Sequence, residues 1–201
     1  MIGTFVLAVA TSTVCATLLN QGILQWREYI GRRETARLSG LYAAIILENY
    51  CDLCSERLGA NQRYVATSGQ SGDEWLGLPD LPDYPGEIDW KRLGLKFAEK
   101  MACFRVDVTL AQRLITFRYD FDPPDGGDHD VLEQLSKKGL EAVQLARAIR
   151  KQHGLSNTAA AREHSSEEHL LASLKDTEEK LQRYREAQQA SLAALREAAP
   201  S

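Results

Sequence analysis

Cys51 and Cys54, in the stretch ENYCDLCSER, have the C-x-x-C spacing of zinc half-sites and of thiol–disulfide catalysts. A thioredoxin-like pair lies at the amino end of a helix, where the helix dipole lowers the thiol pKa. These two cysteines instead lie about five turns into a long helical pattern. Their predicted helix face is apolar and includes Leu47, Tyr50 and Leu58, whereas the opposite face holds Glu48, Asp52, Ser55 and Glu56. We therefore predict that both thiols are small core side chains.

A zinc centre would need two ligands in addition to this pair. The remaining candidates are Cys103 and the four histidines, His129, His153, His164 and His169. His164 and His169 are five positions apart and do not share a helix face, so no second half-site is formed. A thiol- or metal-dependent enzyme or sensor that uses Cys51 and Cys54 is the alternative interpretation.

The acidic stretch DFDPPDGGDHD, residues 120–130, could bind a cation. An EF-hand loop that started at Asp120 would need an oxygen ligand at its fifth position, glycine at its sixth and glutamate at its twelfth. Those positions hold Pro124, Asp125 and Val131. Asp-Pro-Pro-Asp-Gly-Gly is favourable turn chemistry, and an aspartate can cap the next helix without a metal. We predict a solvated turn, with a divalent-cation site as the alternative.

No other catalytic or cofactor-binding template occurs in the chain. It contains no nucleophile elbow, phosphate-binding loop, zinc-protease motif or dinucleotide fingerprint. The formal net charge is −4, which gives no support for nucleic-acid binding. We therefore assign no catalytic, cofactor-binding or metal-ligating residue and expect neither a cofactor nor an identifiable small-molecule substrate.

The first 26 residues contain no charged side chain, and residues 1–19 are almost wholly apolar or small. A helix needs about 20 such residues to cross the hydrocarbon core of a bilayer. Trp26 and Tyr29 follow at the depth where amphipathic aromatic residues lie. We predict that residues 1–26 form an uncleaved transmembrane anchor.

Three alternatives to an anchor fit less well. A signal peptide would begin with positive charge, and a lipoprotein would have a small residue where Val14 precedes Cys15. A buried core helix does not explain the complete lack of charge. Four arginines follow the apolar run, against Glu28 and Glu34: Arg27, Arg32, Arg33 and Arg37. The positive-inside rule then places residues 27–201 in the cytoplasm and the amino terminus outside.

The helical pattern that starts in the anchor is predicted to run from about residue 2 to residue 58, with Gly59 as its stop. The Pro- and Gly-rich residues 60–88 are predicted to form a loop that either packs over the helices as a strap or binds a partner. A second helix is predicted after the N-cap Asp89, with one apolar stripe made of Phe97, Met101, Phe104, Val108, Ala111 and Ile115.

A third helix is predicted from Asp128 or Asp130 to a Schellman stop at Gly154. Its apolar face comprises Leu132, Leu135, Val143, Ala146 and Ile149. Residues 156–201 are charged and rich in alanine, with an interrupted heptad pattern at Leu170, Leu174, Leu181, Tyr184 and Leu195. This tail is predicted to join the bundle, to pair with another copy, or to stay solitary.

The predicted fold is all-α: an anchor over residues 1–26, an antiparallel helical bundle over residues 27–155 with the loop at 60–88, and a coiled-coil-like helix over residues 156–201. The stretches YAAIILENYCDLC, LPDLPDYPGEIDWKRL and GLEAVQLARAIRKQHGL resemble a loose family of uncharacterised bacterial proteins. Those proteins have an N-terminal hydrophobic helix and a small cytoplasmic helical part. The resemblance covers roughly residues 41–155, implies a bacterial inner-membrane location, and carries no known activity.

These features together predict a single-pass scaffold or protein-interaction module rather than an enzyme. Its expected partners are the lipid bilayer and either another protein or a second copy, contacted through the C-terminal helix. An accessory protein of a phage or mobile element is a further interpretation that the sequence does not separate from this one.

Overall fold

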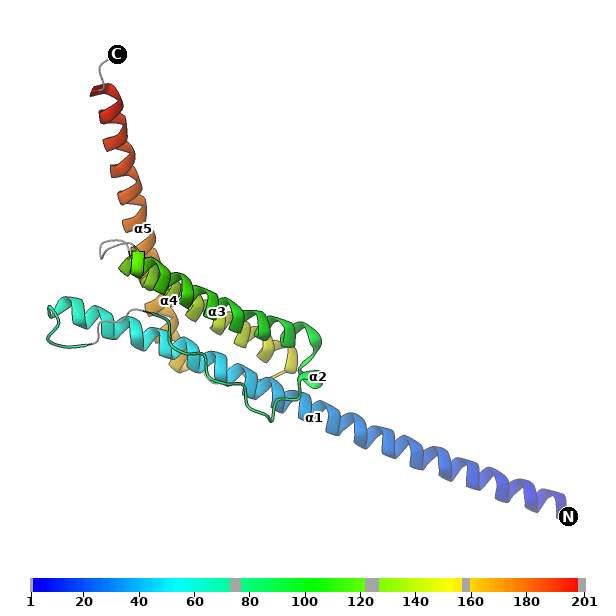
Figure 1. Ribbon diagram of the computed structural model, residues 1–201. Coiled ribbons are helices and arrows are strands. Elements are labelled where there is room, and N and C mark those ends of the chain that lie inside the picture. The colour runs from blue at the N-terminus through cyan, green and yellow to red at the C-terminus, as the bar shows by residue number, and fades with distance from the viewer. Residues whose placement is uncertain (1, 73–76, 122–126, 157–159, 199–201) are drawn as a thin grey trace.

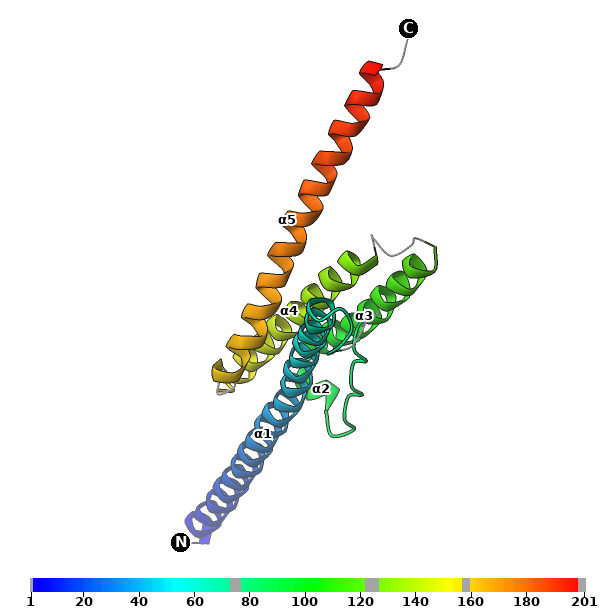
Figure 2. The ribbon, with the colours of Figure 1, turned by 90° about the vertical axis from the view of Figure 1, so that its left-hand side faces the viewer.

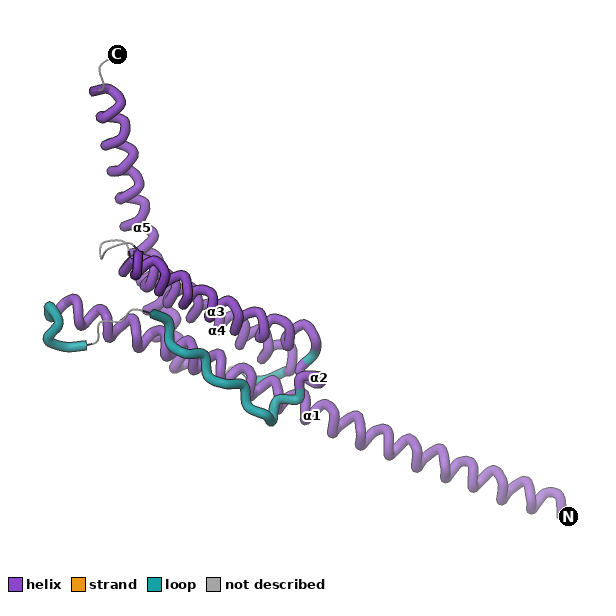
Figure 3. The backbone as a smooth tube through the Cα atoms, viewed as in Figure 1, coloured by secondary structure: helices purple, strands orange, loops and turns teal. Residues whose placement is uncertain are grey.

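The computed structural model describes residues 2–72, 77–121, 127–156 and 160–198, and within these it leaves out the side chains of residues 2–18, 118–121, 127–130, 160–165, 184, 188 and 191–198. Throughout these described ranges the chain forms helices joined by loops, without a strand (Figure 3). The predicted all-α class is therefore confirmed. The described residues form five helices, in order α1 (Ile2–Ala66), α2 (Trp90–Leu93), α3 (Leu95–Phe121), α4 (Gly127–His153) and α5 (Ala160–Ala198).

Helix α1 runs without a break from Ile2 to Ala66, so the predicted stop at Gly59 is wrong. A Cβ atom at Gly59 would lie 3.7 Å from Cε1 of His169, which shows that the glycine lies beside α5 rather than at a turn. The helix ends about two turns later, just before Ser68 and Gly69, which adopt positive φ angles of 51° and 84°. The Gly69 amide donates to the Tyr64 carbonyl at 2.9 Å, which closes a Schellman-type stop.

The amino-terminal half of α1 extends away from the rest of the molecule (Figure 1). From residue 19 to residue 38 its side chains are exposed, apart from a half-buried Ala36. Among the residues whose side chains are described, no helix is both long enough and apolar enough to cross a membrane. The apolar residues 1–18 of the predicted anchor lie outside that set.

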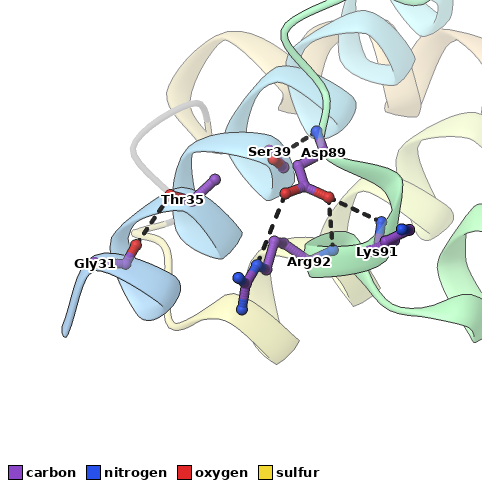
Figure 4. A network of polar contacts seen from close by, with 6 residues as sticks. All are labelled: Gly31, Thr35, Ser39, Asp89, Lys91 and Arg92. Carbon is purple, nitrogen blue, oxygen red and sulfur yellow. Dashed lines mark hydrogen bonds and ion pairs between the residues drawn. The ribbon is translucent and has the colours of Figure 1, made fainter. Parts of the chain in front are cut away.

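Asp89 caps α2 as the sequence predicts. Its Oδ1 accepts the backbone amides of Lys91 at 3.0 Å and Arg92 at 3.2 Å (Figure 4). The Asp89 amide in turn donates to the buried Ser39 hydroxyl of α1 at 3.0 Å. The single predicted helix is, however, divided at Gly94, whose φ of 94° ends α2 before α3 begins.

Helix α4 begins at Gly127 and ends at the predicted stop. Gly154 has a φ of 61°, and the Leu155 amide donates to the Arg150 carbonyl at 2.9 Å. Figures 1 and 2 show α1 and α3 running in the same direction, with α4 packed against both and returning in the opposite direction. The predicted antiparallel bundle therefore consists of two parallel helices and one antiparallel helix.

The core lies where the predicted stripes meet. The face of α1 around Leu47 and Cys51, the stripe of α3 from Phe97 to Ile115, and the face of α4 from Leu135 to Ile149 are all buried. The edge of the Tyr50 ring meets the Phe104 ring with centroids 5.7 Å apart, which joins α1 to α3. The predicted Leu132 is only half-buried.

Residues 77–89, here called the strap, run back along the bundle between α1 and α3 (Figure 3). Leu78 and Ile88 of the strap are buried in the core, and Leu81 and Tyr84 pack against it. The Leu78 amide donates to Oε1 of Gln112 at 2.6 Å, and the Tyr84 hydroxyl donates to the Met101 carbonyl at 2.9 Å. This part of the predicted loop is thus packed; Trp75 and Leu76 lie outside the described residues.

Helix α5 contacts α4 and α1 through buried residues of its amino-terminal half. Leu170 is fully buried there, and Ser173 and Thr177 are also buried, although Thr177 interrupts the heptad pattern. Leu174 and Leu181 are half-buried. The carboxyl-terminal half extends away from the bundle (Figure 2). The remaining predicted seam residues, Tyr184 and Leu195, have side chains outside the described set.

Candidate interaction surface

Both thiols of the C-x-x-C motif are buried, as the helix pattern predicts. Cys54 has no exposed surface and Cys51 almost none. Burial, reinforced by the neighbouring Cys51 thiol, raises the pKa of Cys54 far above its ordinary value. Burial also raises the pKa of Tyr50 strongly, with a further contribution from Cys54. Since the thiolate is the nucleophile and the metal ligand, this environment suppresses both kinds of chemistry.

The other predicted ligands do not gather around the thiols. Cys103 is exposed on α3, where it lines a surface groove with Glu141 and Leu145 of α4. Within the described residues no group of three or more His, Cys, Asp or Glu side chains could hold a metal ion. The side chains of the acidic turn, from Asp120 to Asp130, lie outside that set, as do those of His129 and His164.

Two histidines have structural partners instead. His169 of α5 shares hydrogen bonds with the Ser55 hydroxyl through Nδ1 and with the Gln62 amide oxygen through Nε2, each at 3.0 Å. With a proton on Nε2 the ring donates to Gln62 and accepts from Ser55, so His169 fastens α5 to α1. His153, at the end of α4, packs against Gly40 of α1 and the Phe97 ring of α3.

A buried ion pair lies on the α1 face that the sequence marks as polar. Glu48 and Arg150 are both buried, and Nη2 of Arg150 donates to Oε2 of Glu48 at 2.7 Å, while Nε donates to Oε1. Nη1 of Arg150 also donates to the Ser156 carbonyl at 3.0 Å. The pair joins α1 to the end of α4. Its charges are fully paired, so it has the properties of a structural contact rather than of a reactive centre.

The largest unexplained feature is a second apolar face on α3. The core stripe occupies residues 97, 101, 104, 108, 111 and 115. Residues placed two positions after each of these lie about 200° further round the helix, on the opposite side. This outer seam consists of Glu99, Cys103, Val106, Leu110, Arg113 and Phe117, and all six residues are exposed.

The apolar members of the outer seam are too exposed to belong to the core. The exposed fraction is 56% for Val106, 50% for Leu110 and 61% for Phe117, and the adjacent Leu114 is 62% exposed. Leu95 lies on the same side at the amino end of the helix and is 84% exposed. Single exposed apolar residues are ordinary, but a continuous line of them over several turns marks an interaction surface.

The strap holds the helix that carries this seam. Nη1 of Arg105 donates to Oδ1 of Asp83 at 2.9 Å and Nη2 donates to the Pro82 carbonyl at 2.8 Å. The Arg105 guanidinium also lies 4.4 Å from the centre of the Tyr84 ring. Burial raises the pKa of the Tyr84 hydroxyl, although Arg105 opposes the shift. These contacts place α3 firmly in the bundle and leave its outer seam facing solvent.

The sequence contained a signal for the outer seam. Its residues alternate in steps of four and three from Glu99 to Phe117, the same rhythm as the core stripe. Because α3 is apolar on two opposite faces, its apolar residues do not define a single core-facing side. A pattern of one apolar face therefore indicates the core stripe and misses the outer seam.

Comparisons with protein-family models, with curated proteins and with solved structures found no match for this chain. The resemblance to bacterial membrane-anchored proteins therefore stays a prediction, and the assignment of function depends on the geometry of the chain itself.

Proposed function

We propose that this protein is a single-pass, membrane-anchored helical scaffold that binds protein through the outer seam of α3. The observation that carries the proposal is the line of exposed Val106, Leu110, Leu114 and Phe117 on a helix whose other face is already in the core. This assigns association to α3, whereas the sequence pattern pointed to the C-terminal helix. The burial of Cys51 and Cys54 disfavours the thiol-dependent alternative.

The proposed anchor is residues 1–26 in a bacterial inner membrane, with the bundle on the cytoplasmic side. It is supported by the absence of charge before Arg27 and by the arginines that follow. Trp26 and Tyr29 are exposed on α1, with ring centroids 6.4 Å apart, as expected for side chains that lie at a membrane interface. The continuous α1 would transmit the direction of the anchor to the bundle.

The anchor is tested on the full chain in native membranes. We expect it to stay in the membrane fraction at alkaline pH and to be digested by added protease only in inside-out vesicles. Release at alkaline pH, or digestion from the extracytoplasmic side, contradicts the proposed anchor or its orientation.

The binding surface is tested with a photo-reactive amino acid at Leu110, in those same membranes. We expect a protein adduct of defined mass, which Val106→Glu together with Phe117→Glu reduces at least tenfold. A probe at Lys175, an exposed position on α5, is the matched control and should give no such adduct. Equal adducts at Leu110 and Lys175, or none at either, contradict the proposed surface.

A further inference from the structure

We propose that the partner of the outer seam is a second copy of this chain in the same membrane, paired so that the two α3 helices run parallel. The inference deepens the proposed function and rests on its membrane anchor. Three features lead to it: the shared direction of α1 and α3, the spacing of the seam, and the placement of its two charged residues.

The direction of α3 follows from that of α1. Figures 1 and 2 show the two helices running in the same direction, and α1 is unbroken from Ile2 to Ala66. If α1 leaves the bilayer steeply, α3 also stands steeply, and its outer seam faces sideways rather than toward the lipid surface. A neighbouring chain in the same bilayer presents the same seam, at the same height and with the same orientation. A two-fold axis along the membrane normal then brings the two seams together.

The spacing of the seam suits a parallel helix pair. Steps of four and three place Cys103, Leu110 and Phe117 at one core position of a heptad, and Glu99, Val106 and Arg113 at the other. In a parallel pair each residue meets its own counterpart, so Cys103, Val106 and Leu110 form three consecutive apolar layers at the centre. Leu114 flanks the seam and widens the apolar contact. An isologous contact of this kind needs only one surface.

The two charged residues stand toward the ends of the seam, where both are exposed. In a parallel pair Glu99 lies beside Lys100 of the second copy, because a residue at its heptad position packs next to the following position of the facing helix. By the same rule the Arg113 side chain lies beside Leu114 and Phe117 of the second copy, where its guanidinium can stack on the ring. Glu99 and Arg113 also face their own counterparts in a parallel pair, so the close contact is confined to the apolar layers between them.

Antiparallel pairing is the main geometric competitor. In an antiparallel pair whose two-fold axis passes between the two Val106 residues, Glu99 of one copy would lie opposite Arg113 of the other, since both lie seven residues from Val106. The same rotation would point the two α1 helices in opposite directions, so that one bilayer could not hold both anchors. A charge contact between exposed side chains is too weak to outweigh that constraint.

The test is cysteine crosslinking of the full chain in liposomes, with Cys15→Ser in every variant. Oxidation by copper phenanthroline should give a covalent dimer through Cys103, and Cys103→Ser should abolish it. Adding Val106→Cys or Leu110→Cys to the Cys103→Ser protein should restore the dimer, since every central layer meets itself. Lys175→Cys in the same background is the control and should give at least tenfold less dimer. Dimer yield should persist when the lipid-to-protein ratio is raised tenfold.

Two outcomes would overturn the inference. Crosslinking of a Glu99→Cys chain to an Arg113→Cys chain, without same-position crosslinks at 103 and 110, indicates the antiparallel pair. No dimer above the Lys175→Cys level shows that the seam does not bind a second copy. The proposed function fails separately, if the chain leaves the membrane at alkaline pH or if the photo-reactive probe at Leu110 captures no protein. An adduct with a different protein, without a dimer, keeps the proposed function and rejects self-association.

Discussion

Burial, rather than residue type, decides the chemistry of the polar and reactive side chains on α1. Cys51 and Cys54 have a catalytic spacing, yet they lie with Leu47 and Leu58 in the core, where a thiolate is strongly disfavoured. Glu48 lies beside them in sequence and is also buried, but it remains compatible with the core because Arg150 pairs with both of its carboxylate oxygens. The spacing of these residues in the sequence does not show whether a side chain is reactive or buried. The helix that packs against them decides it.

Breaking the Glu48–Arg150 pair should destabilise the bundle strongly. Glu48→Gln leaves the Arg150 guanidinium buried without its counter-charge, and we expect a loss of about 3–5 kcal/mol in the free energy of unfolding. The measurement is chemical unfolding of the full chain in mild detergent, followed by circular dichroism. Asp176→Asn, which breaks the exposed pair between Asp176 and Lys180, is the control and should change stability by less than about 1 kcal/mol.

Replacing both buried charges separates the charge effect from the packing effect. Glu48→Leu combined with Arg150→Met removes the unpaired charge and keeps apolar volume, so its stability should return close to that of the unaltered chain. If Glu48→Gln were as harmless as Asp176→Asn, the ion pair would not be buried in the folded protein.

At the scale of helices and loops, the sequence predicted what local patterns control. The core stripes of α1, α3 and α4 follow from apolar spacing, and the cap at Asp89 and the stop at Gly154 follow from residue type and position. The stop at Gly59 was wrong because α1 packs there against α5, which is more than 100 residues away in sequence, and the packed helix continues past the glycine. The seam on the outer side of α3 was missed because only tertiary structure shows which apolar face is left exposed.

Protonation at the end of α4 should change the packing of several helices. His153 packs against Gly40 of α1 and Phe97 of α3, and its buried Nε2 has no hydrogen-bond partner among the described residues. Burial lowers the pKa of His153 below its ordinary value of 6.5, although a hydrogen bond to the Leu93 backbone opposes the shift. The folded state therefore favours the neutral ring.

This shift predicts that stability declines in acid. The unfolded chain takes up the proton first, so the contribution of neutral His153 is complete above pH 6.5 and decreases as the pH falls below it. Thermal unfolding at pH 7.5 and at pH 5.5 should show a smaller difference for His153→Gln than for the unaltered chain. The other histidines are present in both proteins, so their contributions to the pH dependence of stability cancel in this comparison. An unchanged difference would show that His153 titrates alike in the folded and unfolded states.

At the scale of the whole molecule, two long helices extend from one small bundle. The amino-terminal half of α1 and the carboxyl-terminal half of α5 both project from it (Figures 1 and 2). Their attachment depends on a crossing of α1, α4 and α5 at Gly139. A Cβ atom there would lie 2.6 Å from Cδ1 of Leu170 and 3.0 Å from Cβ of Cys54. Real Cβ atoms essentially never come as close to a neighbour as 2.6 Å, so an alanine at position 139 requires Leu170 or its surroundings to shift.

Gly139→Ala should therefore loosen α5 and destabilise the bundle, by about 1–3 kcal/mol for overpacking of a closed core. Chemical unfolding measures the loss, and hydrogen exchange over residues 166–181 should show faster exchange in α5 than in α3. Gly31→Ala is the matched control: nothing lies within 4 Å of its Cβ position, so the same change in an exposed helix should stabilise the chain by up to about 1 kcal/mol. Leu170→Ala should lower the free energy of unfolding less in the Gly139→Ala protein than in the unaltered chain, since removing the leucine side chain relieves the nearer clash. Equal stability of Gly139→Ala and the unaltered chain would mean that α5 does not pack at this crossing, and that its position relative to the anchor is not fixed by the bundle.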